Sequence, residues 1–207
     1  MQIPPEVSLQ EGNEYCTQCF KTPLTIMEGS EGKRYACSAC GTISNRRISI
    51  AGSLRWWLDS ERTLWHESAG IFVFNREGRI LFFELTKFPF GLTIPAGHRH
   101  VGEEGMDTAK RELLEETGLQ AKTFQPLGIE DIANDSCGRG ADSHRWHLYM
   151  CIPDSFDMRI DSAEGKDPIW LSIEEALLHK LTAPVTHCIG IYKDVLKDAS
   201  REAQNMR

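Results

Sequence analysis

Three glutamates in the middle of the chain have a spacing that suits metal chemistry. Glu112, Glu115 and Glu116 stand at positions i, i+3 and i+4 of a helical pattern, so their side chains project from one side of the helix. Like charges placed in this way repel each other, and either a solvated face with Arg and Lys partners or a bound divalent cation could compensate them. Oxygen ligands on a rigid element suit Mg²⁺ or Mn²⁺. Arg111, four residues before Glu115, could hold that carboxylate in place.

A second candidate metal site lies in the N-terminal part of the chain, where two Cys-x-x-Cys pairs are separated by seventeen residues. Four thiolates at this spacing could enclose a tetrahedral zinc ion, as in a zinc ribbon, and Gly41 suits the turn after the last pair. A redox dithiol and two chance pairs of buried cysteines are the alternatives. Four protein ligands leave the ion no open position, so we expect the Zn²⁺ to be structural. The predicted ligands are Cys16, Cys19, Cys37 and Cys40.

The other three cysteines, Cys137, Cys151 and Cys188, stand singly, and we expect them to be ordinary free thiols. The total of seven is odd, and the first residues have neither the basic start nor the apolar core of a signal peptide. Both features disfavour a secreted disulfide framework, so we expect a cytoplasmic protein.

The pattern of residue types along the chain predicts the elements that position these groups. Residues 1–13 are expected to be a polar leader, residues 14–50 the zinc ribbon, residues 51–66 an amphipathic linker helix, and residues 67–207 a mixed α/β domain. Within that domain, helices are predicted at 106–117 (ending at Gly118), 173–179 and 185–199. Strands are predicted at 69–75 and 79–86, as a hairpin, and at 92–94, 143–152 and 169–171.

The overall composition excludes several classes of protein. The 207 residues are 41% hydrophobic and 26% charged, which disfavours wholesale disorder and fibrous repeats. The longest apolar runs, 71–74 and 80–83, are far shorter than the roughly 20 residues of a membrane helix, so we expect no membrane contact. With 23 Lys+Arg against 30 Asp+Glu, the net charge of −7 argues against non-specific nucleic-acid binding, although a zinc ribbon could contact nucleic acid or a partner. A homodimer is compatible with this composition.

The segment from Gly97 to Leu119 resembles the Nudix box, G-x5-E-x7-R-E-U-x-E-E-x-G-U, where U is a bulky aliphatic residue. Every fixed position is matched, by Gly97, Glu103, Arg111, Glu112, Leu113, Glu115, Glu116, Gly118 and Leu119. The order of strands and helices extends the resemblance over about residues 68–199. The resemblance implies an α/β fold, a Nudix-type α/β/α sandwich with a mixed β-sheet, here preceded by a small zinc-ribbon module. It also implies hydrolysis of the pyrophosphate bond of a nucleoside diphosphate linked to another moiety.

The resemblance also assigns roles within the box. Glu112, Glu115 and Glu116 would hold Mg²⁺ or Mn²⁺, and one of them, or a carboxylate from a later loop, would activate the attacking water. Glu103 would brace the loop, and Gly97 and Gly118 would allow its turns.

A further metal ligand in this family often comes from the loop before a Trp-containing strand. Glu164, six residues before Trp170, is the candidate, and an ordinary loop acid is the alternative. Glu130 and Asp131 are further candidates on the segment after the box.

Several residues near the box are candidates for substrate binding. Arg145 could bind phosphate in bidentate fashion, and Trp146 could stack on a base or fill the core. Because side chains alternate along a strand, these two cannot face the same side. His98, Arg99 and His100 form a basic patch that could contact phosphate or simply be solvated.

A ribbon ahead of such a box is similar to the arrangement in the NADH pyrophosphatase group. That group also carries Ser-Gln-Pro-Trp-Pro-Phe-Pro-x-Ser after the box, and residues 129–137 have no such motif. The proline of ADP-ribose hydrolases and the tyrosine of dinucleoside polyphosphate hydrolases are replaced by Asn134, Asp135 and Ser136. ADP-ribose, NADH and related nucleotides therefore all stay open as substrates. The alternative is a nucleotide sensor or regulatory binding module, but such modules often lose box acids and none is lost here.

Overall fold

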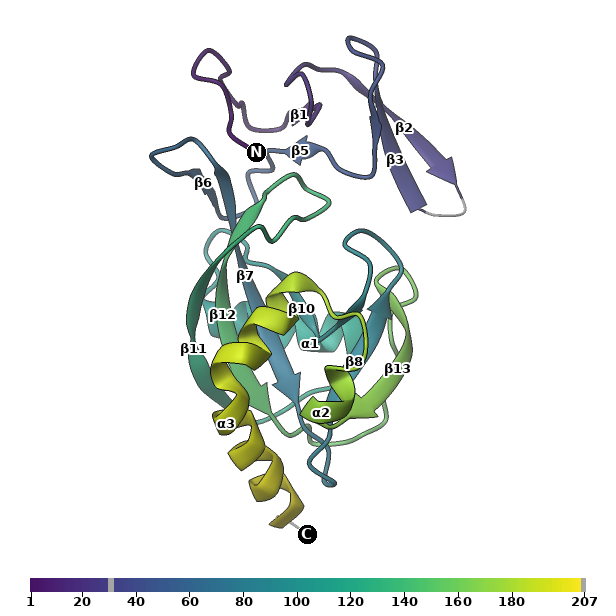
Figure 1. Ribbon diagram of the computed structural model, residues 1–207, viewed down its shortest axis with the longest axis vertical. Coiled ribbons are helices and arrows are strands. Elements are labelled where there is room, and N and C mark those ends of the chain that lie inside the picture. Colours follow the sequence, from purple (N-terminus) through teal and green to yellow (C-terminus); the bar gives the residue numbers. More distant parts are fainter. Residues whose placement is uncertain (30–31, 206–207) are drawn as a thin grey trace.

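The computed structural model describes residues 1–29 and 32–205. Residues 30–31 of the predicted ribbon and residues 206–207 at the end of the predicted α/β domain lie outside the described residues. The N-terminal module contains a two-stranded sheet and a three-stranded antiparallel sheet. Its strands are β1 (Glu14–Tyr15), β2 (Leu24–Gly29), β3 (Gly32–Cys37), β4 (Ile43–Ser44) and β5 (Ile48–Ser49). The module stands at one end of the larger α/β part of the chain (Figure 1).

The α/β part is built on a five-stranded mixed sheet and a three-stranded antiparallel sheet. The mixed sheet has the order β10-β7-β12-β11 with β6 added to β7, and the second sheet has the order β13-β8-β9. The strands of the mixed sheet are β6 (Trp56–Leu58), β7 (Leu64–Val73), β10 (Ala96–His98), β11 (Phe124–Ala133) and β12 (Ser143–Cys151). Those of the second sheet are β8 (Ile80–Leu85), β9 (Leu92–Thr93) and β13 (Gly165–Leu171).

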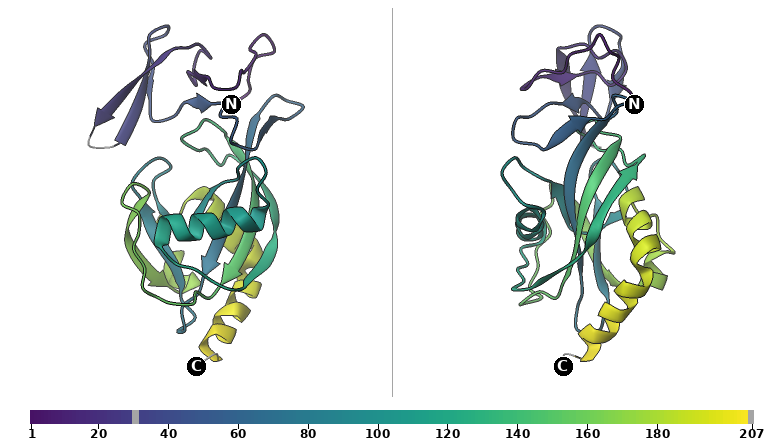
Figure 2. Two further views of the ribbon diagram at one scale, coloured as in Figure 1. Left: turned by 180° about the vertical axis from the view of Figure 1, so that it is seen from behind. Right: turned by 90° about the vertical axis from the view of Figure 1, so that its left-hand side faces the viewer.

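Helices cover both faces of these sheets. Helix α1 (Gly105–Thr117) lies on one face, and α2 (Ile173–Ala176) and α3 (Ala183–Asn205) lie on the other (Figure 2). Separate apolar clusters fill the two interfaces: Ile71 and Leu113 belong to the α1 side, and Phe72 and Ile189 to the α3 side. The predicted α/β/α sandwich with a mixed sheet is therefore confirmed.

Strand β7 is the centre of the sandwich because its side chains are buried on both faces. It pairs with β12 in parallel and with β10 in antiparallel register, Gly97 lying opposite Ala69. The absence of a side chain at Gly70 is required by the close approach of β12, since a Cβ there would lie 2.7 Å from the ring of Trp146. The sequence thus places a glycine where a tryptophan crosses the central strand.

Most of the predicted elements of the α/β part are present. Helix α1 covers the predicted range and ends at Gly118, whose φ of 70° is the left-handed conformation of a C-cap. The two strands predicted as a hairpin and the turn between them are present, but their pairing is limited to an antiparallel bridge between Phe74 and Ile80, because β8 joins the second sheet. Strand β11 was not predicted, since its exposed polar residues obscure the alternation.

The predicted linker helix at residues 51–66 is also wrong, because this segment forms the hairpin of β6 and β7. Trp57 and Trp65 stack across the hairpin with their ring centroids 5.6 Å apart. Asp59 fixes the turn by accepting hydrogen bonds from the backbone N–H of Thr63 at 2.9 Å and from Trp65 Nε1 at 2.8 Å. Aromatic residues favour strands, and these cross-strand contacts override the helical spacing of the apolar positions.

The polar leader is more firmly held than its composition predicts. The side chain of Ile3 is fully buried, and its backbone N–H donates to the carbonyl of Arg62 at 2.9 Å. The terminal amine of Met1 forms an ion pair with Asp142. A single buried isoleucine and these polar contacts therefore dock the leader on the hairpin and on the loop before β12. Among the described residues, no helix is both long enough and apolar enough to span a membrane.

Candidate active site

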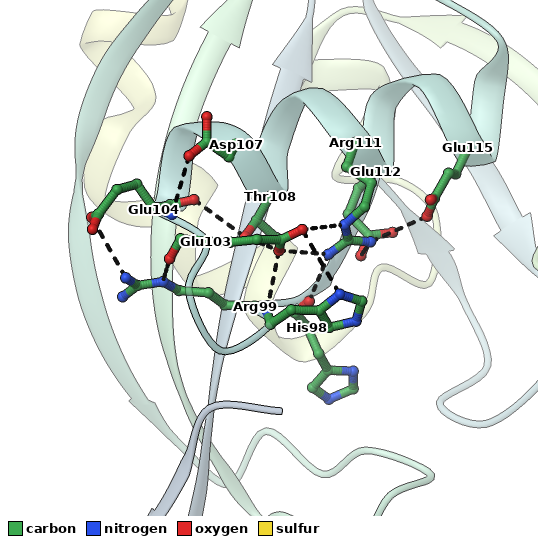
Figure 3. A network of polar contacts seen from close by, with 10 residues as sticks. His98, Arg99, Glu103, Glu104, Asp107, Thr108, Arg111, Glu112 and Glu115 are labelled. Atoms are coloured by element: carbon green, nitrogen blue, oxygen red, sulfur yellow. Dashed lines mark hydrogen bonds and ion pairs between the residues drawn. The ribbon is translucent and has the colours of Figure 1, made fainter. Parts of the chain in front are cut away.

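Arg111 is the centre of the polar network around helix α1 (Figure 3). Its guanidinium donates to both carboxylate oxygens of Glu103, at 2.7 and 3.0 Å, and to the backbone carbonyl of His98 at 3.0 Å. It also donates to Glu112 Oε1 at 2.7 Å and to Glu115 Oε2 at 3.1 Å, the i, i+4 contact expected from the sequence. The Arg111 side chain therefore joins the helix to the loop before it and to the end of β10.

Glu103 braces this loop through several donors at once. Besides Arg111, it accepts from the backbone N–H of His100 at 3.1 Å and from the hydroxyl of Thr108 at 2.9 Å. The hydrogen bonds from Arg111 lower the pKa of the Glu103 carboxyl to about 2. The side chain is thus held as a carboxylate and keeps the loop in a fixed position against the helix.

Glu112 and Glu116 are the two buried carboxylates of the helix, with exposed fractions of 9% and 5%. Glu116 accepts a hydrogen bond from the backbone N–H of Ala96 at 2.8 Å. Burial raises the pKa of both carboxyls, and the negative charge of neighbouring carboxylates, including Glu164, raises them further. Such a cluster favours either protonation or a bound cation, because isolated buried charge is costly.

Gly97 allows Glu112 to lie directly against strand β10. A Cβ at position 97 would be 1.9 Å from Glu112 Oε1 and 2.0 Å from its Cδ. The first glycine of the box therefore makes room for a carboxylate.

The carboxylates of α1 form one side of a cavity of about 970 Å³. Glu112, Glu115, Glu116 and Glu164 all line it. The rest of its lining includes residues from three segments distant in sequence: Tyr35, Asn45 and Arg47 of the N-terminal module, Lys87 to Pro89 of the loop after β8, and Ser136 to Arg139 of the loop before β12. A volume of this size is sufficient for a nucleotide-sized ligand.

Glu164 lies at this cavity and forms an ion pair with Lys87, and its role as a metal ligand stays a prediction. Lys87 and the residues of the N-terminal module were not predicted at the cavity, because no local sequence pattern connects them to α1.

The two arginines expected to bind substrate are engaged elsewhere. Arg145 forms a bidentate pair with Asp131, with both distances 2.7 Å, and lies over the ring of Trp57. Arg99 donates to Glu67 Oε2 at 2.8 Å and to the carbonyl of Glu103 at 2.6 Å. In the part of the chain that the structure describes, neither arginine lines the cavity. Both expectations are corrected: Arg145 pairs with Asp131 on β11, and Arg99 pairs with the buried Glu67 on β7.

The remaining candidates of the sequence also have other contacts. Glu130 accepts from the hydroxyl of Tyr192 at 2.6 Å and, like Asp131, is absent from the described cavity lining. Trp146 is 7% exposed and packs in the core on the α3 side, while its Nε1 donates to Asp135 at 2.7 Å. His98 and His100 both line the cavity.

A family model of the NUDIX domain matches residues 64–188, more than half of the chain. The chain belongs to the NUDIX family. A curated relative, the RNA pyrophosphohydrolase of Bartonella bacilliformis, is 25% identical over 144 residues, covering 56% of this chain and 83% of the relative. With every fixed position of the box in place, the protein is a Nudix hydrolase.

Solved NUDIX structures share the fold of this hydrolase. The MutT NUDIX hydrolase from Burkholderia pseudomallei has a TM-score of 0.53 at 19% identity, covering 61% of this chain and 96% of that one. The NUDIX domain of Shewanella oneidensis NrtR, complexed with ADP ribose, has a TM-score of 0.52 at 16% identity, covering 63% and 87%. The MutT protein from Bacillus halodurans has a TM-score of 0.51 at 24% identity, covering 63% and 81%.

The NUDIX domain is preceded by a four-cysteine cluster that is compatible with a zinc ribbon. The Sγ atoms of Cys16 and Cys40 are 3.7 Å apart, and those of Cys19 and Cys37 are 3.6 Å apart. Zn–S bonds of about 2.3 Å in a tetrahedron place sulfur atoms roughly 3.8 Å apart, far beyond the roughly 2.0 Å of a disulfide. The four thiols therefore have the spacing of tetrahedral zinc ligands.

The single cysteines of this NUDIX protein differ from one another. Cys151 and Cys188 are buried thiols, as expected, and burial raises the pKa of each to about 12. Cys137, also expected to be an ordinary thiol, instead lies against His66, His98 and His144. No local sequence pattern indicates this cluster, because His66 and His98 lie on segments far from Cys137 and His144.

Proposed function

We propose that this protein hydrolyses the pyrophosphate bond of a nucleoside diphosphate linked to another moiety, such as ADP-ribose or NADH, in the presence of Mg²⁺ or Mn²⁺. The observation that carries the proposal is the convergence of Glu112, Glu115, Glu116 and Glu164 on one side of a cavity of nucleotide size. The scissile bond would lie against these carboxylates, and the two moieties would extend into the rest of the cavity.

The carboxylates fit a hard divalent cation. Glu112 and Glu116 are buried and close enough to Glu164 for the three charges to repel. Arg111 compensates Glu112 directly, while the described side-chain contact of Glu116 is with a neutral backbone N–H. Oxygen-rich sites with surplus negative charge are those that Mg²⁺ and Mn²⁺ occupy. When bound, such an ion would neutralise charge on the pyrophosphate and make a hydroxide available near neutral pH.

The chain's own residues would then position the reactants. Water attacks one phosphorus, its proton passes to a carboxylate of this group, and the bond from that phosphorus to the bridging oxygen breaks to release two phosphate-bearing products. Arg111 would keep Glu112 and Glu115 in position, and Glu103 would keep Arg111 in position. This arrangement limits the reorganisation needed during the reaction.

The N-terminal module would supply the side of the cavity that holds the rest of the substrate. Arg47 lies over the ring of Tyr35, with 4.5 Å from its Cζ to the ring centroid, and donates to the Tyr35 hydroxyl at 2.7 Å. Both residues line the cavity together with Lys87. Arg47 also pairs with Glu14, and Lys87 pairs with Glu164, so a bound phosphate would compete with these carboxylates. A guanidinium and an ammonium suit phosphate, and an aromatic face suits a base or nicotinamide. The ribbon is therefore proposed to contribute to substrate binding as well as to stability.

A substrate panel tests this proposal. The purified protein is incubated with ADP-ribose, NADH, dinucleoside polyphosphates, nucleoside triphosphates and 5′-triphosphorylated RNA, each with Mg²⁺ and with Mn²⁺, and the products are separated and quantified. We expect metal-dependent turnover, with a nucleoside monophosphate released from ADP-ribose or NADH. Tight binding of one compound without turnover of any would instead indicate a nucleotide sensor. Selective turnover of triphosphates or RNA would contradict the proposed substrate class.

A further inference from the structure

A second cluster of soft metal ligands lies beside the proposed active site and outside the four-cysteine ribbon. It is formed by His66 on β7, His98 on β10, Cys137 in the loop before β12 and His144 on β12. One ligand atom from each residue lies within 4.8 Å of all the others. The three imidazoles pack closely, with ring centroids 5.0 to 5.6 Å apart.

The spacing of these atoms is near that of a tetrahedral site. Cys137 Sγ is 3.7 Å from His66 Nδ1. Zn–S and Zn–N bonds of about 2.3 and 2.1 Å at tetrahedral angles place sulfur and nitrogen roughly 3.6 Å apart and two nitrogens roughly 3.4 Å apart. The distances between ligand atoms are at most 4.8 Å, so each atom would have to shift by about 1 Å to reach these values, and rotation of the imidazole rings can supply such shifts.

The cluster is largely buried and is only partly satisfied by hydrogen bonds. His66 is fully buried and His144 is 2% exposed. The Nε2 atom of His98 is enclosed and has no hydrogen-bond partner among the described residues. Buried polar atoms of this kind are rare, and a ligand often explains them. In Figure 3 the ring of His98 points away from α1 and its carboxylates, so it is not part of the box network.

Asp135 gives the cluster the outer partner that metal-bound histidines commonly have. The Nδ1 atom of His144 lies 2.9 Å from the backbone carbonyl of Asp135 and 3.1 Å from its carboxylate. This contact sets Nδ1 as the donor and leaves Nε2 as the ligand atom. Asp135 is itself 4% exposed, and among the described residues no Lys or Arg lies within ion-pair distance of it. A divalent ion would balance one thiolate and this carboxylate.

We propose that His66, His98, Cys137 and His144 form a second zinc site, distinct from the four-cysteine site and from the carboxylates of α1. One thiolate and three imidazoles are borderline-soft ligands that suit Zn²⁺ rather than Mg²⁺. Four protein ligands close the coordination sphere, so the site is structural.

The position of the site would let a bound ion cross-link two parts of the cavity wall. The carbonyl of Cys137 accepts from Arg46 Nε at 3.0 Å, and the next residue's carbonyl accepts from the backbone N–H of Arg47 at 3.2 Å, so the Cys137 loop is attached to the N-terminal module. On the other side, the carbonyl of His98 accepts from Arg111. A zinc ion here would join the ribbon side of the cavity to the start of the box.

Zinc counting by mass spectrometry of the intact, chelator-free protein tests the proposal. We expect two Zn²⁺ per chain in the wild type, one in Cys137→Ala, one in the ribbon double variant Cys16→Ser/Cys19→Ser, and none in the combination. Cys188→Ala is the matched control, since it removes a buried thiol elsewhere and should retain two. One Zn²⁺ in the wild type that is lost completely in the ribbon variant would overturn the proposal.

A spectroscopic measurement on the wild type tests the proposal without any variant, so its result does not depend on whether a variant folds. X-ray absorption at the zinc edge should give five sulfur and three nitrogen ligands over two ions, the sum of the two clusters. An average of four sulfur ligands per zinc would leave only the ribbon site and would overturn the proposal. Neither readout depends on hydrolysis, so the result is independent of the proposed function.

Discussion

Substitution of Gly97 by alanine tests whether the position of Glu112 controls activity. Gly97 lies in strand β10 and does not have a positive φ, so its backbone accepts alanine. The new Cβ would stand 1.9 Å from Glu112 Oε1, whereas ordinary contact begins near 3.4 Å. The carboxylate must therefore move by about 1.5 Å, and a displacement of this size near the reacting atoms can cost about 100-fold in rate. We expect kcat/KM to fall by about that factor, or about 2.7 kcal/mol in transition-state stabilisation.

Stability should change much less than activity in this variant. The atoms that clash belong to the end of a flexible side chain that borders the cavity, so the carboxylate can move without distorting the core. We expect the free energy of unfolding to change by about 1 kcal/mol or less. Gly190→Ala is the matched control, because a Cβ at this exposed position of α3 meets nothing within 4 Å. It should leave kcat/KM unchanged and raise stability by about 0.5–1 kcal/mol.

The assay is steady-state hydrolysis of the best substrate of the panel, with thermal unfolding of each variant measured in parallel. A Gly97→Ala variant with kcat/KM within threefold of the wild type would refute the reasoning, because Glu112 would then tolerate displacement. A fall in the free energy of unfolding large enough to unfold the variant under assay conditions would also refute it, because the loss of activity would then come from unfolding.

Three other predictions follow from the contacts of the site. Glu103→Gln should lower the free energy of unfolding at pH 7 by about 1–3 kcal/mol, because it weakens charged hydrogen bonds. Since the folded pKa of Glu103 is depressed to about 2, the wild type's advantage should be complete above pH 4.5 and lost as the pH falls toward 2, which chemical denaturation at several pH values can follow. Arg145→Ala should change kcat and KM by less than about twofold, because the side chain pairs with exposed Asp131, and a large rise in KM would restore it as a phosphate ligand. Disabling the ribbon with Cys16→Ser should raise KM more than it lowers kcat, and an unchanged KM would exclude the ribbon from substrate binding.

The helix that carries the chemistry could be predicted from sequence because its signals are local. Glu112, Glu115 and Glu116 share a face through helical spacing alone, and Gly118 ends the helix through its own conformation. At residues 51–66 the apolar spacing is also helical, but cross-strand stacking of Trp57 on Trp65 determines a hairpin instead.

The rest of the site could not be predicted because it depends on tertiary contacts. The cavity is lined by Tyr35, Arg47 and Lys87, which come from segments far from α1. Arg145 was expected to bind phosphate, but its side chain pairs with Asp131. The cluster around Cys137 is formed by four residues on four different segments, without the short ligand spacing that revealed the ribbon.

The central claim is that the buried carboxylates of α1 hold the ion on which hydrolysis depends. The most direct measurement is the Mg²⁺- or Mn²⁺-dependent turnover of the best substrate by Glu116→Gln and by the wild type. Thermal unfolding of both proteins is measured in parallel, to show that the variant is folded at the assay temperature. The substitution keeps the shape and removes the charge at a side chain that is 5% exposed. We predict that turnover is abolished while the fold is retained. Turnover equal to that of the wild type would contradict the assignment of the metal site.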